Sequence, residues 1–260
     1  MTAERPDPRP ITEQEKLAAG QTVAGVSFEP ALSLDDADLS ERQFERCLFR
    51  LAAIRGADFS GSTFRDCRFE STRITNCKLA GARFHNCTLF DLTQKKGCTF
   101  AFCALQDAEM LKSNFATSAF ERCDLYNLRA AECSFRGVRF NRSTFTKVLS
   151  KRIVVSKASF DRCNFSFADL SGLHLQSCKF LSCKLSEASL IGTDLSQATM
   201  AACALDRVEW DQARLRQADL RGSQISGLNL AVLSDYAGLT VSESEQTTIL
   251  RELGVNVSAE

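Results

Sequence analysis

The pattern that decides the fold is clear in the stretch Ala57-Asp58-Phe59-Ser60-Gly61-Ser62-Thr63-Phe64-Arg65-Asp66-Cys67-Arg68-Phe69. A large apolar residue returns at every fifth position, and we call it the centre of its five-residue unit. The residue two places before most centres, here called the small position, is Ala, Ser, Thr or Cys. A period of five is neither the 3.6 of a helix nor the 2 of a strand. The pattern therefore indicates a repeat architecture.

The same pattern runs through most of the chain. Centres recur from Leu34 to Leu89, from Phe100 to Phe145 with a lapse at Ala130, and from Phe160 to Leu230. All twelve cysteines occupy small positions. This regularity predicts buried, reduced thiols that act as small apolar side chains, and it favours neither disulfides nor zinc ligands. His85 and His174 fall on outward positions remote from each other, so we expect no metal site and no cofactor.

Composition excludes several classes of protein. The 260 residues hold 32 Lys+Arg and 32 Asp+Glu, which argues against a strongly basic nucleic-acid binder. No apolar run approaches 18 residues, and the N-terminus is polar and rich in proline, so we expect no membrane span and no export signal. Twelve unpaired thiols fit a reducing compartment. These features predict a cytoplasmic protein.

Two interruptions break the period. The spacing is 11 residues between Leu89 and Phe100 and 15 between Phe145 and Phe160. Excising six and ten residues brings the small positions of successive 20-residue coils back into one column, which predicts projecting loops at residues 90–97 and 146–157. Loops on a rigid scaffold often carry function. The alternatives are that both are tolerated insertions without a function or that the second consists of two degenerate repeats with Ile153 and Val155 inside.

Charge singles out the second loop. Residues 31–230 hold 28 basic and 22 acidic residues. Lys147, Lys151, Arg152 and Lys157 supply four of those positive charges, next to several β-branched and apolar residues. A basic, partly apolar projection suits a partner surface, although lysines beside apolar runs also serve as solubility gatekeepers.

Both ends carry signals for helical caps, which would cover the open edges of a repeat rod. Ser242-Glu243-Ser244-Glu245 predicts a capping box before a helix of about ten residues that ends at Gly254. The tail after Gly254 could form a short strand. Near the N-terminus, Thr12-Glu13-Gln14-Glu15 predicts a second capping box and a short helix that ends at Gly20, preceded by a proline-punctuated arm.

The units Ala57-Asp58-Phe59, Ala168-Asp169-Leu170 and Ala218-Asp219-Leu220 resemble the A-(D/N)-L-x-x motif of the pentapeptide-repeat family. This resemblance implies an all-β solenoid, a right-handed quadrilateral β-helix in which four units make one coil. The repeats then give about nine coils, stacked at about 4.8 Å. The expected divisions are an N-terminal extension (1–25), the β-helix with its two loops (26–235) and a C-terminal helix and cap (236–260).

The order of these parts resembles the quinolone-resistance (Qnr) pentapeptide-repeat proteins. Shared features are a smaller loop ending Gln94-Lys95-Lys96-Gly97, a larger loop after Phe145, a late tryptophan centre at Trp210, and a terminal Leu250-Arg251-Glu252-Leu253-Gly254-Val255. The resemblance implies a cytoplasmic homodimer that binds DNA gyrase and topoisomerase IV and relieves quinolone inhibition through the larger loop. The rod's net positive charge departs from relatives described as DNA mimics, which need a negative surface, and favours a loop mechanism over pure mimicry.

Candidate residues follow from this resemblance. Partner contacts are expected from Val148, Leu149, Ser150, Lys151, Arg152, Gln94, Lys95 and Lys96. Dimerisation or capping is expected from Ile249, Leu250, Leu253 and Val255. The sequence has no catalytic motif, so an enzyme is not expected. Direct nucleic-acid binding is not expected either, because the phenylalanines are placed inside the rod as centres. The alternative function is a β-helical scaffold or adaptor that binds another protein through its flat faces.

Overall fold

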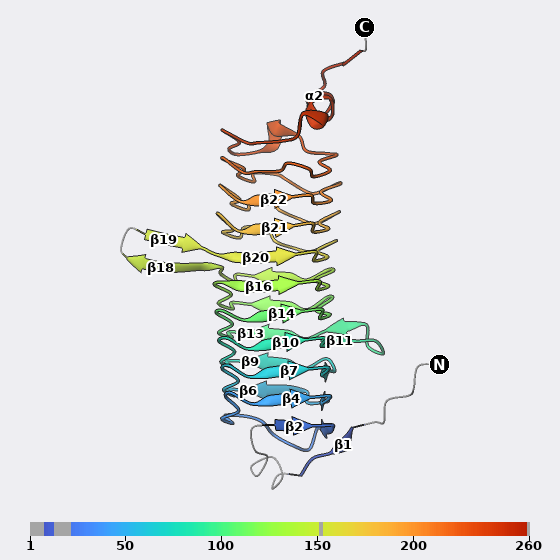
Figure 1. Ribbon diagram of the computed structural model, residues 1–260, viewed down its shortest axis with the longest axis vertical. Helices are drawn as coiled ribbons and strands as arrows, with labels where there is room; N and C mark the ends of the chain where they lie inside the picture. Colours follow the sequence, from blue (N-terminus) through green and yellow to red (C-terminus); the bar gives the residue numbers. More distant parts are fainter. Residues whose placement is uncertain (1–7, 13–21, 151–152, 259–260) are drawn as a thin grey trace.

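The computed structural model describes residues 8–12, 22–150 and 153–258, and shows a rod of stacked coils with two projecting hairpins and a helix at the C-terminal end (Figure 1). The expected all-β solenoid of about nine coils, with two loops and a short terminal helix, is confirmed. The helix expected near residues 12–20 falls mainly outside the described residues.

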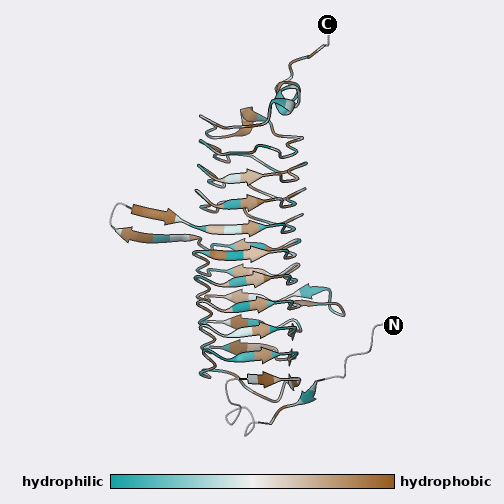
Figure 2. Cartoon of the chain, viewed as in Figure 1, coloured by the Kyte–Doolittle hydropathy of each residue, from teal (hydrophilic) through white to brown (hydrophobic). Residues whose placement is uncertain are grey.

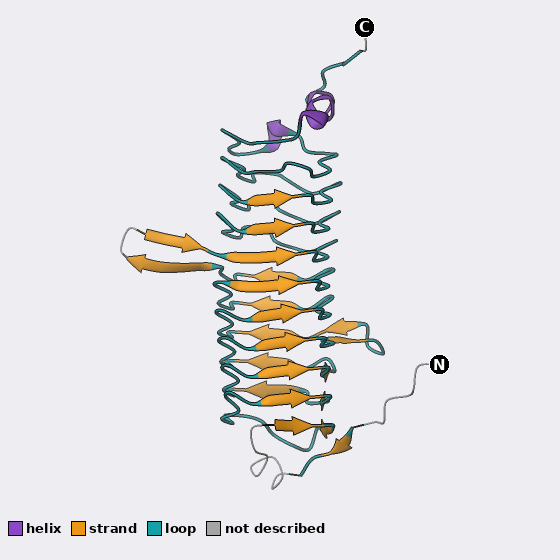
Figure 3. Ribbon diagram, in the orientation of Figure 1, coloured by secondary structure: helices purple, strands orange, loops and turns teal. Residues whose placement is uncertain are grey.

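Short parallel strands, each two to four residues long, stack one coil above the next. The longest stack, the nine-stranded face, lies toward the viewer in Figure 3. It consists of β2 (Thr22–Ala24), β4 (Gln43–Glu45), β7 (Thr63–Arg65), β10 (Arg83–His85), β14 (Glu109–Leu111), β16 (Leu128–Ala131), β20 (Ala158–Asp161), β21 (Lys179–Leu181) and β22 (Thr199–Ala201).

Three further faces complete the square coil. The four-stranded face holds β1 (Arg9–Pro10), β3 (Val26–Phe28), β5 (Leu48–Phe49) and β8 (Arg68–Phe69). The five-stranded face holds β6 (Ala53–Arg55), β9 (Arg73–Thr75), β13 (Thr99–Ala101), β15 (Ala119–Glu121) and β17 (Arg139–Asn141). The fourth face is held by single bridges such as Asp38 to Asp58 and Asp194 to Arg214.

Most corners between faces place one residue in the left-handed backbone region, which turns the chain onto the next face. This residue lies two places after a centre. Its side chain points outward, and Arg46, Arg122 and Arg142 all take this position with φ of 52°. The five-residue period is therefore one short strand plus one turn.

Centres fill the interior as ladders of like side chains. Phe44, Phe64 and Phe84 stack in parallel with ring centroids 4.9 Å apart, and Phe100 and Phe120 do the same on the five-stranded face. Aromatic pairs of this kind contribute about 0.5–1.5 kcal/mol beyond their burial. The core is one continuous column because each coil buries its apolar side chains against the next.

Register is kept across both interruptions. Arg83 pairs with Glu109, an offset of 26, and Arg129 pairs with Ser159, an offset of 30. The lapse at Ala130 has a packing reason: Ala130 is buried as a centre, and the adjacent small position holds the larger Leu128, also buried. Large and small side chains have exchanged places within one unit.

Candidate functional site

The larger interruption is an antiparallel hairpin of β18 (Thr146–Ser150) and β19 (Ile153–Ser156), set against an otherwise parallel rod. Thr146 pairs with Ser156 and Val148 with Val154, and the register shifts between Val148 and Ser150. β-branched residues favour this extended ribbon. The hairpin projects well beyond the coils and begins directly after the centre Phe145 (Figure 1).

Exposed apolar side chains distinguish the β18–β19 hairpin. The exposed fractions are 69% for Val148, 58% for Leu149, 52% for Ile153 and 61% for Val154. Figure 2 shows the ribbon as a hydrophobic projection. The alternative of two degenerate repeats is wrong because Ile153 lies in solvent. Several exposed apolar side chains on one projection are typical of an interaction surface.

The root of this hairpin is fixed to the rod. The Lys157 N–H donates to the Phe145 carbonyl (3.0 Å), and the Lys157 carbonyl accepts from the Asn127 N–H (2.7 Å). The Lys147 ammonium lies 5.5 Å from the centre of the Tyr126 ring. Ser150 is exposed, and Lys151 and Arg152, also expected at the contact tip, lie outside the described residues.

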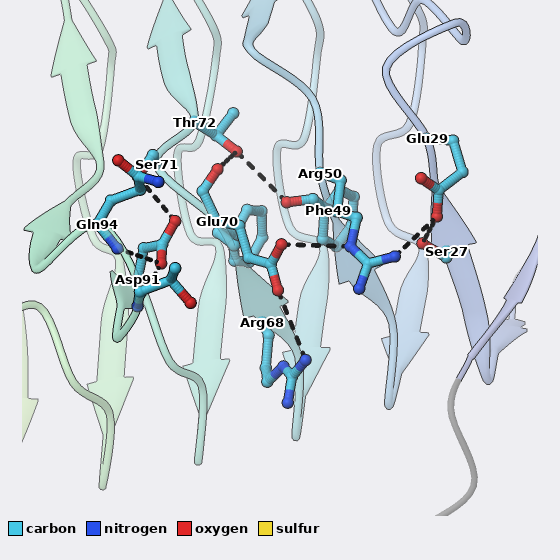
Figure 4. A network of polar contacts seen from close by, with 12 residues as sticks. Ser27, Glu29, Phe49, Arg50, Arg68, Glu70, Ser71, Thr72, Asp91 and Gln94 are labelled. Atoms are coloured by element: carbon cyan, nitrogen blue, oxygen red, sulfur yellow. Dashed lines mark hydrogen bonds and ion pairs between the residues drawn. The ribbon is translucent and has the colours of Figure 1, made fainter.

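The smaller interruption is a second hairpin of β11 (Phe90–Asp91) and β12 (Lys96–Gly97). Asp91 closes it: one carboxylate oxygen accepts from the backbone N–H groups of Thr93 (2.8 Å) and Gln94 (3.0 Å), and the other accepts from the Ser71 hydroxyl (3.0 Å). Figure 4 shows this anchor at the end of a ladder that joins Glu29, Arg50 and Glu70.

The expected contact residues of the smaller hairpin, Gln94, Lys95 and Lys96, are all exposed, as is Leu92 at 79%. The two hairpins project from opposite sides of the rod (Figure 1). The structure therefore does not bring these residues together with Val148 and Leu149.

The C-terminal segment differs in detail from the expected helix. The capping box at Ser242 is wrong: the Ser242 hydroxyl instead accepts from the Gly222 N–H of the preceding coil at 2.7 Å. A 3₁₀ turn, η2 (Glu243–Glu245), leads into α2 (Gln246–Glu252), and Gly254 ends the helix with φ of 81°. A second 3₁₀ turn, η1 (Leu230–Val232), closes the last regular coil. No strand forms at residues 255–258.

The four expected capping residues divide into two groups. Ile249 is partly buried and packs against the core. Leu250, Leu253 and Val255 are exposed by 40%, 44% and 46%. This end of the rod therefore presents apolar surface.

Sequence reasoning missed two residues. Phe102 and Phe167 are exposed by 51% and 47%, whereas sixteen of the nineteen phenylalanines are buried. Each carries an arginine over its ring: Arg122 lies 5.4 Å from the Phe102 centroid and Arg136 lies 4.5 Å from that of Phe167. The signal was present in the sequence because both residues lie two places after a centre.

Burial shifts the pKa of several side chains of the rod. Burial, followed by the nearby Arg65 charge, lowers the pKa of His85. Burial raises the pKa of the Cys98 and Cys178 thiols to about 12. Within residues 8–12, 22–150 and 153–258, no three His, Cys, Asp or Glu side chains gather as a metal site, and no helix is long and apolar enough to cross a membrane.

Comparison with known proteins identifies the repeats and the fold. A family model for pentapeptide repeats (8 copies) matches residues 33–70, and one for the pentapeptide repeat region matches residues 153–230. Neither model describes a catalytic family. No curated protein matches the sequence.

Solved structures match most of the chain in fold. A trypsin-treated variant of QnrB1, a plasmid-mediated fluoroquinolone resistance protein, has a TM-score of 0.64 at 21% identity, covering 80% of this chain and 99% of its own. Full-length QnrB1 has a TM-score of 0.61 at 18% identity, covering 90% and 97%. At these identities the likeness is one of fold.

Proposed function

Since the chain is a pentapeptide-repeat protein, we propose that it binds DNA gyrase and topoisomerase IV and protects them from quinolones through the β18–β19 hairpin. The observation that carries this proposal is the exposed apolar ribbon on a rigid rod. The rod has the fold of QnrB1, itself a fluoroquinolone resistance protein.

The hairpin suits insertion into a partner. Full burial of a Val, Leu or Ile side chain contributes about 1.5–3 kcal/mol, so Val148, Leu149, Ile153 and Val154 together supply several kcal/mol on binding. Association itself costs a comparable amount. We therefore expect the rod or the smaller hairpin to add contacts, and Gln94, Lys95 and Lys96 are candidates for them.

We propose a mechanism that this geometry supports. The basic, apolar hairpin reaches into the drug-stalled enzyme and destabilises its drug-bound cleavage state. The rod holds the hairpin root in place through Phe145, Lys157 and Asn127, so the hairpin loses little conformational freedom on binding. The role is non-enzymatic: the protein acts by binding.

A gyrase supercoiling assay with ciprofloxacin tests the proposal. Added wild-type protein is expected to restore supercoiling at modest molar excess. Excision of residues 146–157, or the double substitution Val148→Ser/Val154→Ser, is expected to abolish the restoration. Leu181→Ser is the matched control, because Leu181 is 39% exposed on the nine-stranded face, away from the hairpin. Protection that survives hairpin excision would favour the alternative of a scaffold that binds through its faces.

We further propose that the C-terminal segment pairs two copies of the chain. Leu250, Leu253 and Val255 supply the apolar surface for this contact. A dimer formed at this end would cover the open edge of the last coil.

A further inference from the structure

The five-stranded face carries an unusual group of side chains between its two edges. Phe102 follows the centre of β13 at one edge. Phe167 lies at the opposite edge, just before Asp169, which bridges to Arg139 of β17. Arg122 and Arg136 lie over the two rings. We name Phe102, Arg122, Arg136, Arg139, Arg142 and Phe167 the arginine–aromatic face.

Its arginines differ from most others on the rod. Ten other described arginines bind a carboxylate, most of them one on a neighbouring coil, as Arg129 binds Glu109 (2.6 Å) and Arg207 binds Glu187 (2.6 Å). Arg122, Arg136, Arg139 and Arg142 form no ion pair with any described residue, and all four are exposed. Four positive charges thus lie on one face without the partners that the repeat normally supplies.

Arg122 and Arg142 form the sharpest part of this face. They take the same corner position in consecutive coils, since the Arg122 N–H donates to the Asn141 carbonyl, so their backbones lie about 4.8 Å apart. Gly172 occupies this corner in the following coil, and a Cβ there would meet no atom within 4 Å. Guanidinium groups carried by neighbouring corners repel each other unless an anion lies between them.

A pocket of about 410 Å³ opens at this point, lined by Phe102, Arg122, Asn141, Arg142, Asp169 and Ser171. The two carboxylates of the pocket already have partners within the protein. Glu121, which also lines the pocket, binds Arg73 at 2.9 Å, and Asp169 accepts from the Ser171 backbone N–H at 3.0 Å. The pocket therefore offers donors and one aromatic ring to an incoming group.

We infer that the arginine–aromatic face binds an acidic segment of a partner protein. One carboxylate lies between Arg122 and Arg142, and a neighbouring apolar side chain packs on Phe102. Arginine and aromatic residues are the types enriched at protein interfaces, and guanidinium–carboxylate pairs are strong and directional. Glu121 and Asp169 flank this place, so one carboxylate between Arg122 and Arg142 meets less repulsion than the unbroken run of charges of a DNA backbone, which disfavours DNA as the occupant. The inference does not rest on the β18–β19 hairpin.

Fluorescence anisotropy tests this inference with a defined probe. The probe is the fluorescein-labelled peptide Gly-Asp-Glu-Phe-Glu-Asp-Leu-Glu-Gly, and its partner peptide has Asn and Gln in place of Asp and Glu. We expect the acidic peptide alone to bind wild-type protein. Arg122→Gln/Arg142→Gln should weaken binding at least about tenfold, and Phe102→Ala several-fold. Arg46→Gln is the matched control, since Arg46 is exposed at the same corner position on another face.

Several outcomes would overturn the inference. They are equal binding of both peptides, no binding of either, or an equal loss in Arg46→Gln and the double variant. A double-stranded DNA fragment that binds through Arg122 and Arg142 where the peptide does not would make this a nucleic-acid surface instead. Thermal unfolding of each variant checks that the rod is intact, and the gyrase assay, which depends on the hairpin, reports separately on the proposed function.

Discussion

Side chains at the small position both fill space and bind backbone. The Cys67 thiol lies 3.3 Å from the Phe44 carbonyl of the preceding coil, and the Ser113 hydroxyl lies 3.1 Å from the Phe84 carbonyl. Cysteine and serine can both occupy this column because both are small donors that satisfy a buried oxygen. The sequence predicted the cysteines as reduced and buried, and all twelve are free and buried.

Burial of the thiols makes stability depend on pH. The Cys178 pKa is about 12 in the folded protein, against an ordinary value of 9.0. Above pH 9 the unfolded chain releases this proton and the folded chain keeps it, so the free energy of unfolding falls as pH rises toward 12. The expected contribution is about 1.4 kcal/mol per pH unit. Urea unfolding between pH 8 and about 10.5 should show a shallower decline for Cys178→Ser, and parallel curves for the two proteins would contradict this.

Glycine is required at position 97 because the backbone of residues 116–118 lies very close to it at the end of the smaller hairpin. A Cβ at this position would lie 2.4 Å from the Ser118 nitrogen and 2.5 Å from the Ala116 oxygen, both backbone atoms. Gly97→Ala is therefore expected to lower the free energy of unfolding by about 1–3 kcal/mol. Gly192→Ala is the control, because Gly192 has φ of 63° but open space around it, and should cost about 1 kcal/mol. Equal losses in urea unfolding would rule out the steric explanation.

At the scale of elements, the β18–β19 hairpin is expected to contribute little to the stability of the rod. Val148→Ser/Val154→Ser should change the free energy of unfolding by less than about 1 kcal/mol, because both side chains are mostly exposed. Phe160→Ala, at the first centre after the hairpin, should cost about 3–5 kcal/mol because Phe160 is buried. Chemical denaturation of the three proteins measures both effects. A large loss in the hairpin variant would show that the hairpin packs on the coils.

Most of the fold could be predicted from the repeat because the residue types in each five-residue unit distinguish its buried positions from its outward ones. It located both loops, since a gap in the period marks a departure from the rod. It could not show that these loops form hairpins, because strand pairing depends on contacts within an exposed segment that has no period. The capping box failed for a similar reason: Ser242 binds Gly222 of a neighbouring coil, a tertiary contact that local sequence does not encode.

The candidate site was predicted in part. Exposure of Val148 and Leu149 followed from the lost period, and the structure agrees with that placement. Phe102 and Phe167 were overlooked because phenylalanine was assigned to the interior as a class, although their places in the unit are outward. The missing ion partners of Arg122 and Arg142 depend on which side chains meet across a 20-residue coil, and that pairing was visible only in the structure.

At the scale of the whole molecule, the C-terminal end of the rod differs from its middle. The smaller hairpin and the β18–β19 hairpin interrupt its middle, whereas its C-terminal end presents Leu250, Leu253 and Val255 above the last coil. α2 has only seven residues and none of them is buried. A helix of this length is marginal in water unless its apolar side is covered.

A second copy of the chain is the covering that we propose, and mass measurement tests it. Wild-type protein is expected to elute in size-exclusion chromatography with light scattering at twice the 28.7 kDa of one chain. Leu250→Glu/Leu253→Glu should shift it to the single-chain mass, because two pairs of carboxylates would face each other across a twofold axis. Leu181→Glu is the control, since it adds charge at an exposed leucine on the side of the rod and should leave the mass unchanged. If wild type elutes as a single chain, or the double variant keeps the doubled mass, the helix only caps its own rod, and any second interface must be sought on the faces.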